Sequence, residues 1–356
     1  MEIKNTRNNI GKGTLAAILL SMAAALIILR LTAGPDFMPS LFRIRPAYLA
    51  IAGAIMILGW ITDAIRIGLL VRALKGKLSF MQSLRISLIG AFVSAVTPFD
   101  TGGEPVQVYM LQQAGITIGE STAVIAVKTI LSALARFVLG SAFPVWLIMS
   151  KRTWDIPRGM NIAISIGLAL YFIAMFLGVF FMVRPHTAIG ITRTILGNRL
   201  VKRVISDKLA QTMITRISDE VIAFRSALKK FMIEHRPVLI LVALLGFLGW
   251  IFLFLIPILI LVGMGVSPPY AGAMGIISIF YLAAAYAPTP GASGAAEASF
   301  AILFGQIVPF HLLGVFVIIW RFVTYHLTLI VGGALMATSF FKRRTKRDKS
   351  NGAGSN

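Results

Sequence analysis

Long apolar runs alternate with short polar and basic links along this chain of 356 residues. A helix needs about 20 predominantly apolar residues to cross the hydrocarbon core of a bilayer. The runs that reach about this length are Thr14–Ala33, Ala47–Leu70, Ser121–Met149, Ile162–Val183, Val238–Val262 and Leu312–Thr338. The pattern predicts an all-α, polytopic membrane protein, with about six full spans in one membrane domain over residues 14–341.

Two shorter apolar segments each run into a break rich in Pro and Gly. Each break is followed by a stretch too short to cross alone, Glu104–Ala114 and Ala295–Val308. We therefore predict two broken re-entrant hairpins, over residues 79–114 and 268–308, because lipid cannot satisfy the backbone groups that such breaks free. The residues expected to form the breaks are Pro98, Asp100, Gly102, Gly103, Pro288, Pro290, Gly291 and Gly294.

A lone glutamate follows each break, and a basic residue stands 24 positions further on: Lys128 after Glu104, and Arg321 after Glu297. A carboxylate in hydrocarbon needs a partner, so we expect Lys128 to pair with Glu104 and Arg321 with Glu297. These pairs could line a substrate path or only lock each hairpin to the next helix, and Glu104 could instead cap the helix that follows it. Such breaks in corresponding places of two halves indicate a transport site.

The charge balance is 34 basic against 13 acidic residues, a net charge of +21. The positive charges flank the spans, where they set topology and attract anionic headgroups, so no nucleic-acid partner is expected. The positive-inside rule places residues 1–13, 184–236 and 342–356 in the cytoplasm, with both termini. The hairpins then enter from opposite sides, which predicts an inverted-topology repeat in the inner, cytoplasmic membrane of the cell.

Residues 184–236 form the largest predicted cytoplasmic segment. Apolar residues there recur at steps of three and four among basic ones, as at Val201, Val204, Ile205 and Leu209. This spacing favours an amphipathic helix on the inner leaflet, although a basic loop with some helix fits equally well. The basic tail 342–356 is predicted to be disordered.

The sequence lacks the residues that several kinds of chemistry require. The chain has no cysteine, and its four histidines are widely scattered, so we expect neither a disulfide nor a metal site. It has no GxSxG motif, P-loop or acidic metal-binding cluster. We therefore predict no catalytic residue and no cofactor, and the chain is not expected to be an enzyme.

Further polar residues share helix faces with the two cations. Arg136 lies two turns after Lys128, and Tyr325 and His326 lie one turn after Arg321. These residues could line a cavity. Tyr325 and His326 could instead anchor the helix at the membrane interface. Asp63 and Arg66 are three residues apart and are expected to pair locally rather than relay protons. The predicted substrate-binding residues are Glu104, Gln107, Lys128, Arg136, Glu297, Arg321, Tyr325 and His326.

The two breaks resemble motifs of a known family. They read Pro98-x-x-x-Gly102-Gly103-Glu104-x-x-Gln107-x-Tyr109 and Pro288-x-Pro290-Gly291-x-x-Gly294-x-x-Glu297-Ala298. Both are similar to motifs of the lysylphosphatidylglycerol synthase transmembrane family, also described as the flippase-like domain or UPF0104 family. The segment Arg66–Leu78 and the closing Arg321-Phe322-x-Thr324-Tyr325 fit as well, and the resemblance extends over about Thr14 to Phe341.

The resemblance implies a flippase that moves a polar-headgroup lipid between leaflets. In the best-known members the lipid is aminoacylated phosphatidylglycerol and a soluble synthase domain follows. This chain ends at Asn356 without one, so it is not expected to make that lipid. Stand-alone relatives are linked to hopanoids or polyprenyl-linked sugars. Gln107 takes a position that is often Arg in the family, and Ser132 one that is often acidic, which could change headgroup selectivity.

Two other functions stay open. The chain could be a membrane-embedded lipid-modifying transferase, or a non-transporting partner that docks a separate synthase through residues 184–236. The expected partners are membrane lipids, in particular anionic or aminoacylated phospholipid. A homo-oligomer and a separate synthase partner also stay open.

Overall fold

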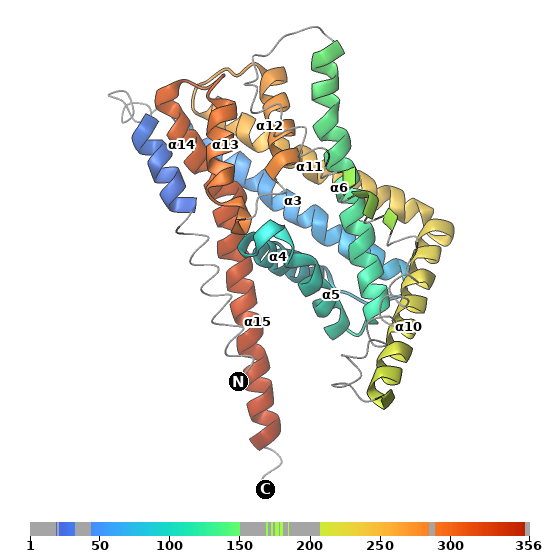
Figure 1. Ribbon diagram of the computed structural model, residues 1–356. Helices are drawn as coiled ribbons and strands as arrows, with labels where there is room; N and C mark the ends of the chain where they lie inside the picture. Colours follow the sequence, from blue (N-terminus) through green and yellow to red (C-terminus); the bar gives the residue numbers. More distant parts are fainter. Residues whose placement is uncertain are drawn as a thin grey trace.

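The computed structural model describes residues 21–32, 44–149, 207–284 and 289–352, together with residue 19 and a few residues between 169 and 184. These residues fold into helices and include no strand (Figure 1), which confirms the all-α prediction. Helices long and apolar enough to cross a membrane are Pro46–Ala73, Ile118–Ser141, Arg236–Gly263 and Phe310–Ser339. The protein is thus a multi-pass helical membrane protein.

Four of the six predicted spans coincide with these helices. The predicted span at residues 14–33 is described only in part, as a shorter apolar helix, Ser21–Thr32. The predicted span at residues 162–183 lies largely outside the described residues.

Two sets of helices follow each other in the same order. The first set is α3 (Pro46–Ala73), α4 (Phe80–Val96), the 3₁₀ turn η1 (Pro98–Asp100), α5 (Gly103–Gln113) and α6 (Ile118–Met149). The second set is α11 (Arg236–Gly263), α12 (Tyr270–Ala284), the 3₁₀ turn η3 (Pro290–Ala292), α13 (Ala295–Phe304), α14 (Phe310–Arg321), the π turn η4 (Phe322–His326) and α15 (Leu327–Gly352). The helices α11 and α12 begin 190 residues after α3 and α4, and η3, α13 and α14 begin 192 residues after η1, α5 and α6. The fold is therefore a structural repeat.

Both breaks have the same unusual backbone. Phe99 and Asp100 in η1 have φ of 56° and 58°, and Gly291 and Ala292 in η3 have φ of 56° and 54°. Left-handed backbone is unfavourable for residues other than glycine, at about 1–2 kcal/mol each, so tertiary contacts must hold it. Those contacts include the other break, because η1 and η3 pack against each other. The two hairpins meet at their tips.

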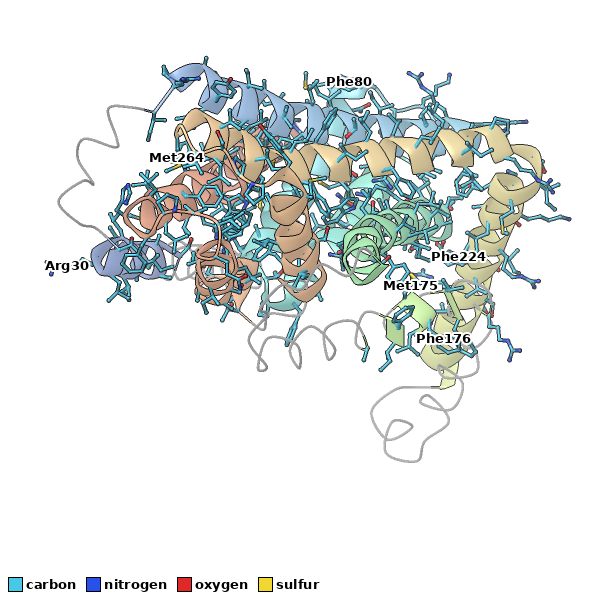
Figure 2. The ribbon with its side chains drawn as sticks, turned by 90° about the horizontal axis from the view of Figure 1, so that it is seen from above. Arg30, Phe80, Met175, Phe176, Phe224 and Met264 are labelled. Carbon is cyan, nitrogen blue, oxygen red and sulfur yellow. The ribbon has the colours of Figure 1, made fainter. Side chains whose placement is uncertain are left out.

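The centre of the molecule is built on α3 and α11. These two helices lie side by side (Figure 2), and α6 packs against α11 and α12 while α15 packs against α4. Buried apolar side chains form one large cluster around α11 to α14 and a second around α3, α6 and α10. The helix α10 (Asp207–Lys229) is followed by the π turn η2 (Lys230–Glu234), which leads into α11.

The predicted amphipathic helix within residues 184–236 is α10, which packs on α6. Its Phe224 is buried, and Glu220 accepts a hydrogen bond from the Gly119 amide at the start of α6, at 2.5 Å. The helix α10 is therefore part of the folded body rather than only a surface attachment. Residues 201, 204 and 205 of the predicted pattern lie outside the described residues.

The expectation of a disordered tail does not hold for Lys342–Gly352, whose backbone continues α15. The span that precedes the tail has already formed the costly helix nucleus, and Lys and Arg propagate a helix well.

Candidate functional site

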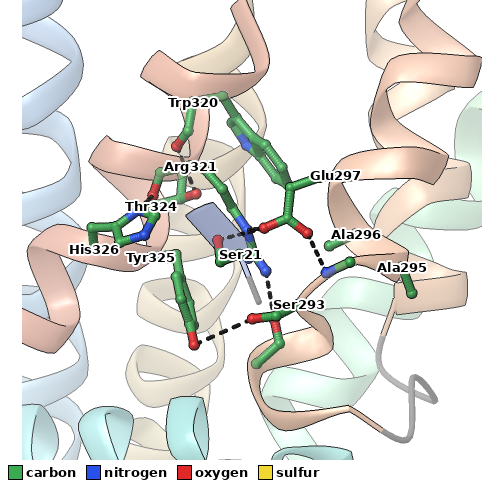
Figure 3. A network of polar contacts seen from close by, with 12 residues as sticks. Ser21, Ser293, Ala295, Ala296, Glu297, Trp320, Arg321, Thr324, Tyr325 and His326 are labelled. Carbon is green, nitrogen blue, oxygen red and sulfur yellow. Dashed lines mark hydrogen bonds and ion pairs between the residues drawn. The ribbon is translucent and has the colours of Figure 1, made fainter. Parts of the chain in front are cut away.

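The second break contains a closed ionic network (Figure 3). Glu297 is fully buried, and its Oε1 accepts hydrogen bonds from Ser21 Oγ at 2.5 Å and from Arg321 Nε at 2.6 Å. Its Oε2 accepts from the Gly294 amide at 2.7 Å, as a glutamate at the third residue of a helix can do for the capping residue. The predicted pair of Glu297 and Arg321 is confirmed.

Arg321 and Tyr325 join this network to the hairpin tips. Arg321 Nη2 donates to the Gly291 carbonyl oxygen at 2.7 Å, and its guanidinium lies 4.2 Å from the centre of the Tyr325 ring. The Tyr325 hydroxyl donates to the carbonyl oxygen of Ala95, at the end of α4, at 3.1 Å. It also lies 3.5 Å from Ser293 Oγ in the second break. Tyr325 therefore connects the two hairpins.

A π turn places Tyr325 in this position. The turn covers Phe322–His326, and the imidazole Nδ1 of His326 lies 3.2 Å from the Arg321 carbonyl oxygen. Single π turns inside helices frequently occur at functional sites. Because Tyr325 is buried against the two breaks, it is not an interfacial anchor.

An aromatic cluster holds α13 on α14. The rings of Phe300 and Trp320 stack with centres 3.8 Å apart, and both side chains are buried. Phe300 lies one turn after Glu297, and Trp320 directly precedes Arg321, so this stacking brings the carboxylate to the guanidinium. Further rings pack around the pair: Phe280, Phe304 and Phe316.

A second ionic cluster lies in the first half, between α3, α4 and α6. Asp63 Oδ2 accepts hydrogen bonds from Ser87 Oγ at 2.6 Å and from Lys128 Nζ at 3.1 Å. Asp63 Oδ1 lies 3.4 Å from Arg66 Nη1, which confirms the predicted local pair. We name Asp63, Arg66 and Lys128 the first-half cluster.

Arg66 of α3 forms hydrogen bonds to two other helices. Its Nη1 donates to Ser132 Oγ at 2.7 Å, its Nη2 to the Lys128 carbonyl oxygen at 2.8 Å, and its Nε to the Val242 carbonyl oxygen at 3.1 Å. A Cβ added at Gly246 of α11 would lie 3.0 Å from the guanidinium, so the glycine leaves room for it. The bonds join α3 to α6 and α11.

The predicted pair of Lys128 and Glu104 is wrong, because Lys128 pairs with Asp63. Glu104 is half-buried, and no described residue forms an ion pair with it. It is the second residue of α5, whereas Glu297 is the third residue of α13. One residue turns a helix by about 100°, so the two glutamates face different directions despite their equal spacing to a cation.

The remaining predicted residues lie around the first hairpin and α6. Gln107 of α5 is buried against α4, where a Cβ added at Gly90 would lie 2.6 Å from the Gln107 Cγ. Arg136 stacks on Trp250 of α11, with its guanidinium carbon 5.2 Å from the ring centre. Pro288 lies outside the described residues.

The start of α5 is held without Glu104. The Gly102 amide donates to Thr97 Oγ1 at 3.0 Å, and a Cβ added at Gly103 would lie 2.7 Å from the Gly90 carbonyl oxygen. The close approach of α4 and α5 therefore requires glycine at the break.

A cavity of about 430 Å³ lies at the turn between α3 and α4, at the opposite end of α4 from the hairpin tips. Its lining residues are Arg72, Gly76, Lys77, Leu78, Ser79 and Gln82. Ser79 and Gln82 bond each other's backbone amides and so cap α4.

Sequence reasoning missed Ser21 as a partner of Glu297 and Asp63 as the partner of Lys128. A signal for Asp63 was present, because an acid in an apolar span is rare and must find a cation. Ser21 gave no signal, since a serine in a span commonly bonds its own helix.

The chain is similar to known proteins along most of its length. Residues 14–332 match the family described as lysylphosphatidylglycerol synthase TM region. The chain is 30% identical over 328 residues to a UPF0104 membrane protein of Archaeoglobus fulgidus, and the alignment covers 92% of this chain and 97% of that relative.

Proposed function

The chain belongs to the lysylphosphatidylglycerol synthase transmembrane-region family, and from that premise we propose that it moves a polar-headgroup lipid between the leaflets of its membrane. The lipid would be of the aminoacyl-phosphatidylglycerol, hopanoid or polyprenyl-linked type. Its headgroup would pass along the polar residues near the hairpin tips, while its acyl chains stay in the bilayer. The lipid would leave chemically unchanged.

The observation that carries this proposal is the meeting of the two breaks, with buried charges on either side. Ionisable side chains are expensive inside a membrane and usually mark a path for a polar substrate. Broken helices in corresponding places of two repeats are typical of transporters, where the site lies between the repeats. Here η1 and η3 touch, and Tyr325 of the second half bonds Ala95 of the first.

The proposal includes an orientation. We place both termini and the basic helix α10 in the cytoplasm and the protein in the cell membrane. The support is the positive-inside rule, since α10 exposes Arg216, Arg225 and Lys229. With this orientation the hairpins enter from opposite sides as re-entrant elements.

The test is lipid translocation in liposomes. Purified protein is reconstituted with a trace of fluorescent phosphatidylglycerol, and dithionite then bleaches the label in the outer leaflet. We expect the protein to make the inner-leaflet label accessible, unlike protein-free liposomes. The extracted lipid is then analysed by mass spectrometry, because a changed mass would instead indicate a transferase.

Two matched glutamate variants sharpen this test. Glu104→Gln removes a half-buried carboxylate at the start of α5, just after the first break, and Glu234→Gln removes an exposed one on the turn before α11. We expect Glu104→Gln to slow translocation about tenfold, equivalent to ~1.4 kcal/mol at the barrier, and Glu234→Gln to match the wild type. Equal rates in protein-free and wild-type liposomes, both with the phosphatidylglycerol probe and with a labelled lipid of each of the three proposed types, would refute the proposed function.

A second candidate is a partner that docks a separate synthase without transporting lipid. The exposed basic side chains Arg216, Arg225 and Lys229 on α10 favour it. Replacing all three by Gln would then abolish function in cells, and neither this variant nor the wild type would translocate lipid in liposomes. If the protein is the transporter, Glu104→Gln would slow translocation and reduce function in cells; if it only docks a synthase, Glu104→Gln would leave function in cells unchanged.

A further inference from the structure

The two ionic networks differ in net charge. In the second half one carboxylate, Glu297, meets one guanidinium, Arg321, and the pair is neutral. In the first-half cluster one carboxylate, Asp63, meets two cations, Arg66 and Lys128. Among the residues that the structure describes, the first-half cluster therefore carries a net charge of +1.

The excess charge resides on Lys128. The guanidinium of Arg66 donates to Asp63, to Ser132 and to two backbone carbonyl oxygens, so it has little capacity left for another ligand. The ammonium of Lys128 has three N–H groups, and within the described part of the chain its acceptor is Asp63 Oδ2. Two N–H donors of this buried cation thus have no acceptor among the described residues.

The cluster also reaches the molecular surface. The Asp63 side chain is 28% exposed, compared with 10% for Lys128 and 0% for Glu297. A ligand could therefore approach Lys128 past Asp63, whereas Arg321, itself 7% exposed, has a fully buried carboxylate, Glu297, as its partner.

We propose that Lys128 binds the phosphodiester anion of a lipid headgroup, and that Asp63 holds its ammonium in place when the lipid is absent. The proposal rests on the proposed function and names the part of the lipid that the first half recognises. An uncompensated charge in a membrane protein is unfavourable, and an anion neutralises it. A cationic group at the same place would raise the net charge to +2. Glu297 and Arg321 take no part in this binding and only lock the second hairpin.

The test is a binding titration of the full chain in detergent micelles. The probes are short-chain phosphatidylglycerol, diacylglycerol of the same chain length, which lacks the phosphate, and inorganic phosphate. We expect phosphatidylglycerol to bind and diacylglycerol to bind at least tenfold more weakly, because a charge-assisted hydrogen bond is lost.

Four variants test the expected direction of each change in binding affinity. Lys128→Met should weaken phosphatidylglycerol binding about tenfold to a hundredfold, while Lys128→Arg, which keeps the charge, should stay within about threefold. Asp63→Asn should bind at least as tightly as the wild type, because it removes the competing carboxylate. Lys75→Met, which removes an exposed cation at the turn after α3, should bind as the wild type does. Asp63→Asn keeps the proposal testable if Lys128→Met does not fold.

Wild-type affinity in Lys128→Met, or weaker binding in a folded Asp63→Asn, would overturn the proposal. Inorganic phosphate that binds with the same dependence on Lys128 would support the site and assign it to a free anion as well as to a lipid. Translocation that fails while this binding persists would refute the proposed function and leave the site standing. If translocation occurs and Lys128→Met binds phosphatidylglycerol as tightly as the wild type, the site is refuted and the proposed function stands.

Discussion

The Glu297–Arg321 pair offers the sharpest stability test, because replacing one partner leaves a charge buried. We choose Glu297→Gln, which keeps the shape of the side chain and removes its charge. Glu297 accepts three hydrogen bonds, from Ser21, Arg321 and the Gly294 amide, at 2.5 to 2.7 Å. A glutamine has one acceptor oxygen, so its NH₂ group must face at least one of these donors.

The expected loss is large. Breaking a buried ion pair by removing one partner costs about 3–5 kcal/mol, since the remaining charge has no compensation. Arg321→Gln should lose a similar amount. The double variant buries no charge, so its loss should be smaller than the sum of the single losses by about 1–3 kcal/mol.

The assay is reversible unfolding in mixed micelles, followed by circular dichroism as the fraction of denaturing detergent rises. Glu234→Gln, an exposed carboxylate, serves as the control and should stay within about 0.5 kcal/mol of the wild type. The reasoning is refuted if Glu297→Gln also stays within that range. The reasoning is equally refuted if the sum of the two single losses equals the loss of the double variant to within about 0.5 kcal/mol, as it does for independent sites.

Three further substitutions test the contact region of the two breaks in the same unfolding assay. Gly291→Ala should lower the free energy of unfolding by at least about 2 kcal/mol, because φ at this position is 56° and the new Cβ would lie 2.7 Å from the Ala95 carbonyl oxygen. Wild-type stability of this variant would show that the hairpin tips do not touch. Tyr325→Phe should lose about 1 kcal/mol with its hydrogen bond to Ala95, and no loss would mean that the hydroxyl does not hold the hairpins together. Glu104→Gln should change stability by less than about 0.5 kcal/mol, and a loss as large as that of Glu297→Gln would reveal a hidden partner.

The helices and breaks were predictable from the sequence because each depends on local properties. The length and hydropathy of a run indicate a span, and Pro98 and Pro290 with the following glycines mark where a helix must stop. Both predicted pairs that the structure confirms, Asp63 with Arg66 and Glu297 with Arg321, join residues of one helix or of one hairpin and the next helix.

The rest of the site depends on tertiary packing. Ser21 is 276 residues away from Glu297 in the chain, and Tyr325 meets Ala95 across 230 residues. Neither contact leaves a pattern in the sequence, since a serine or tyrosine in a span has many possible partners. The π turn after Arg321, which turns Tyr325 toward the tips, also has no reliable sequence signal.

The failed pairing of Glu104 explains how the two halves came to differ. Both glutamates precede a cation by 24 residues, but both members of the second pair lie one residue later relative to their helices than those of the first. At the third helical position Glu297 can bond the capping amide and face Arg321 at once, whereas Glu104 at the second position is turned away by about 100°. Lys128 consequently takes its acid from α3, which Arg66 already shares, and a positive charge remains. A one-residue difference in register thus accompanies a neutral ion pair in one half and a net positive cluster in the other, and of these two networks the positive one has a physical reason to attract an anionic headgroup.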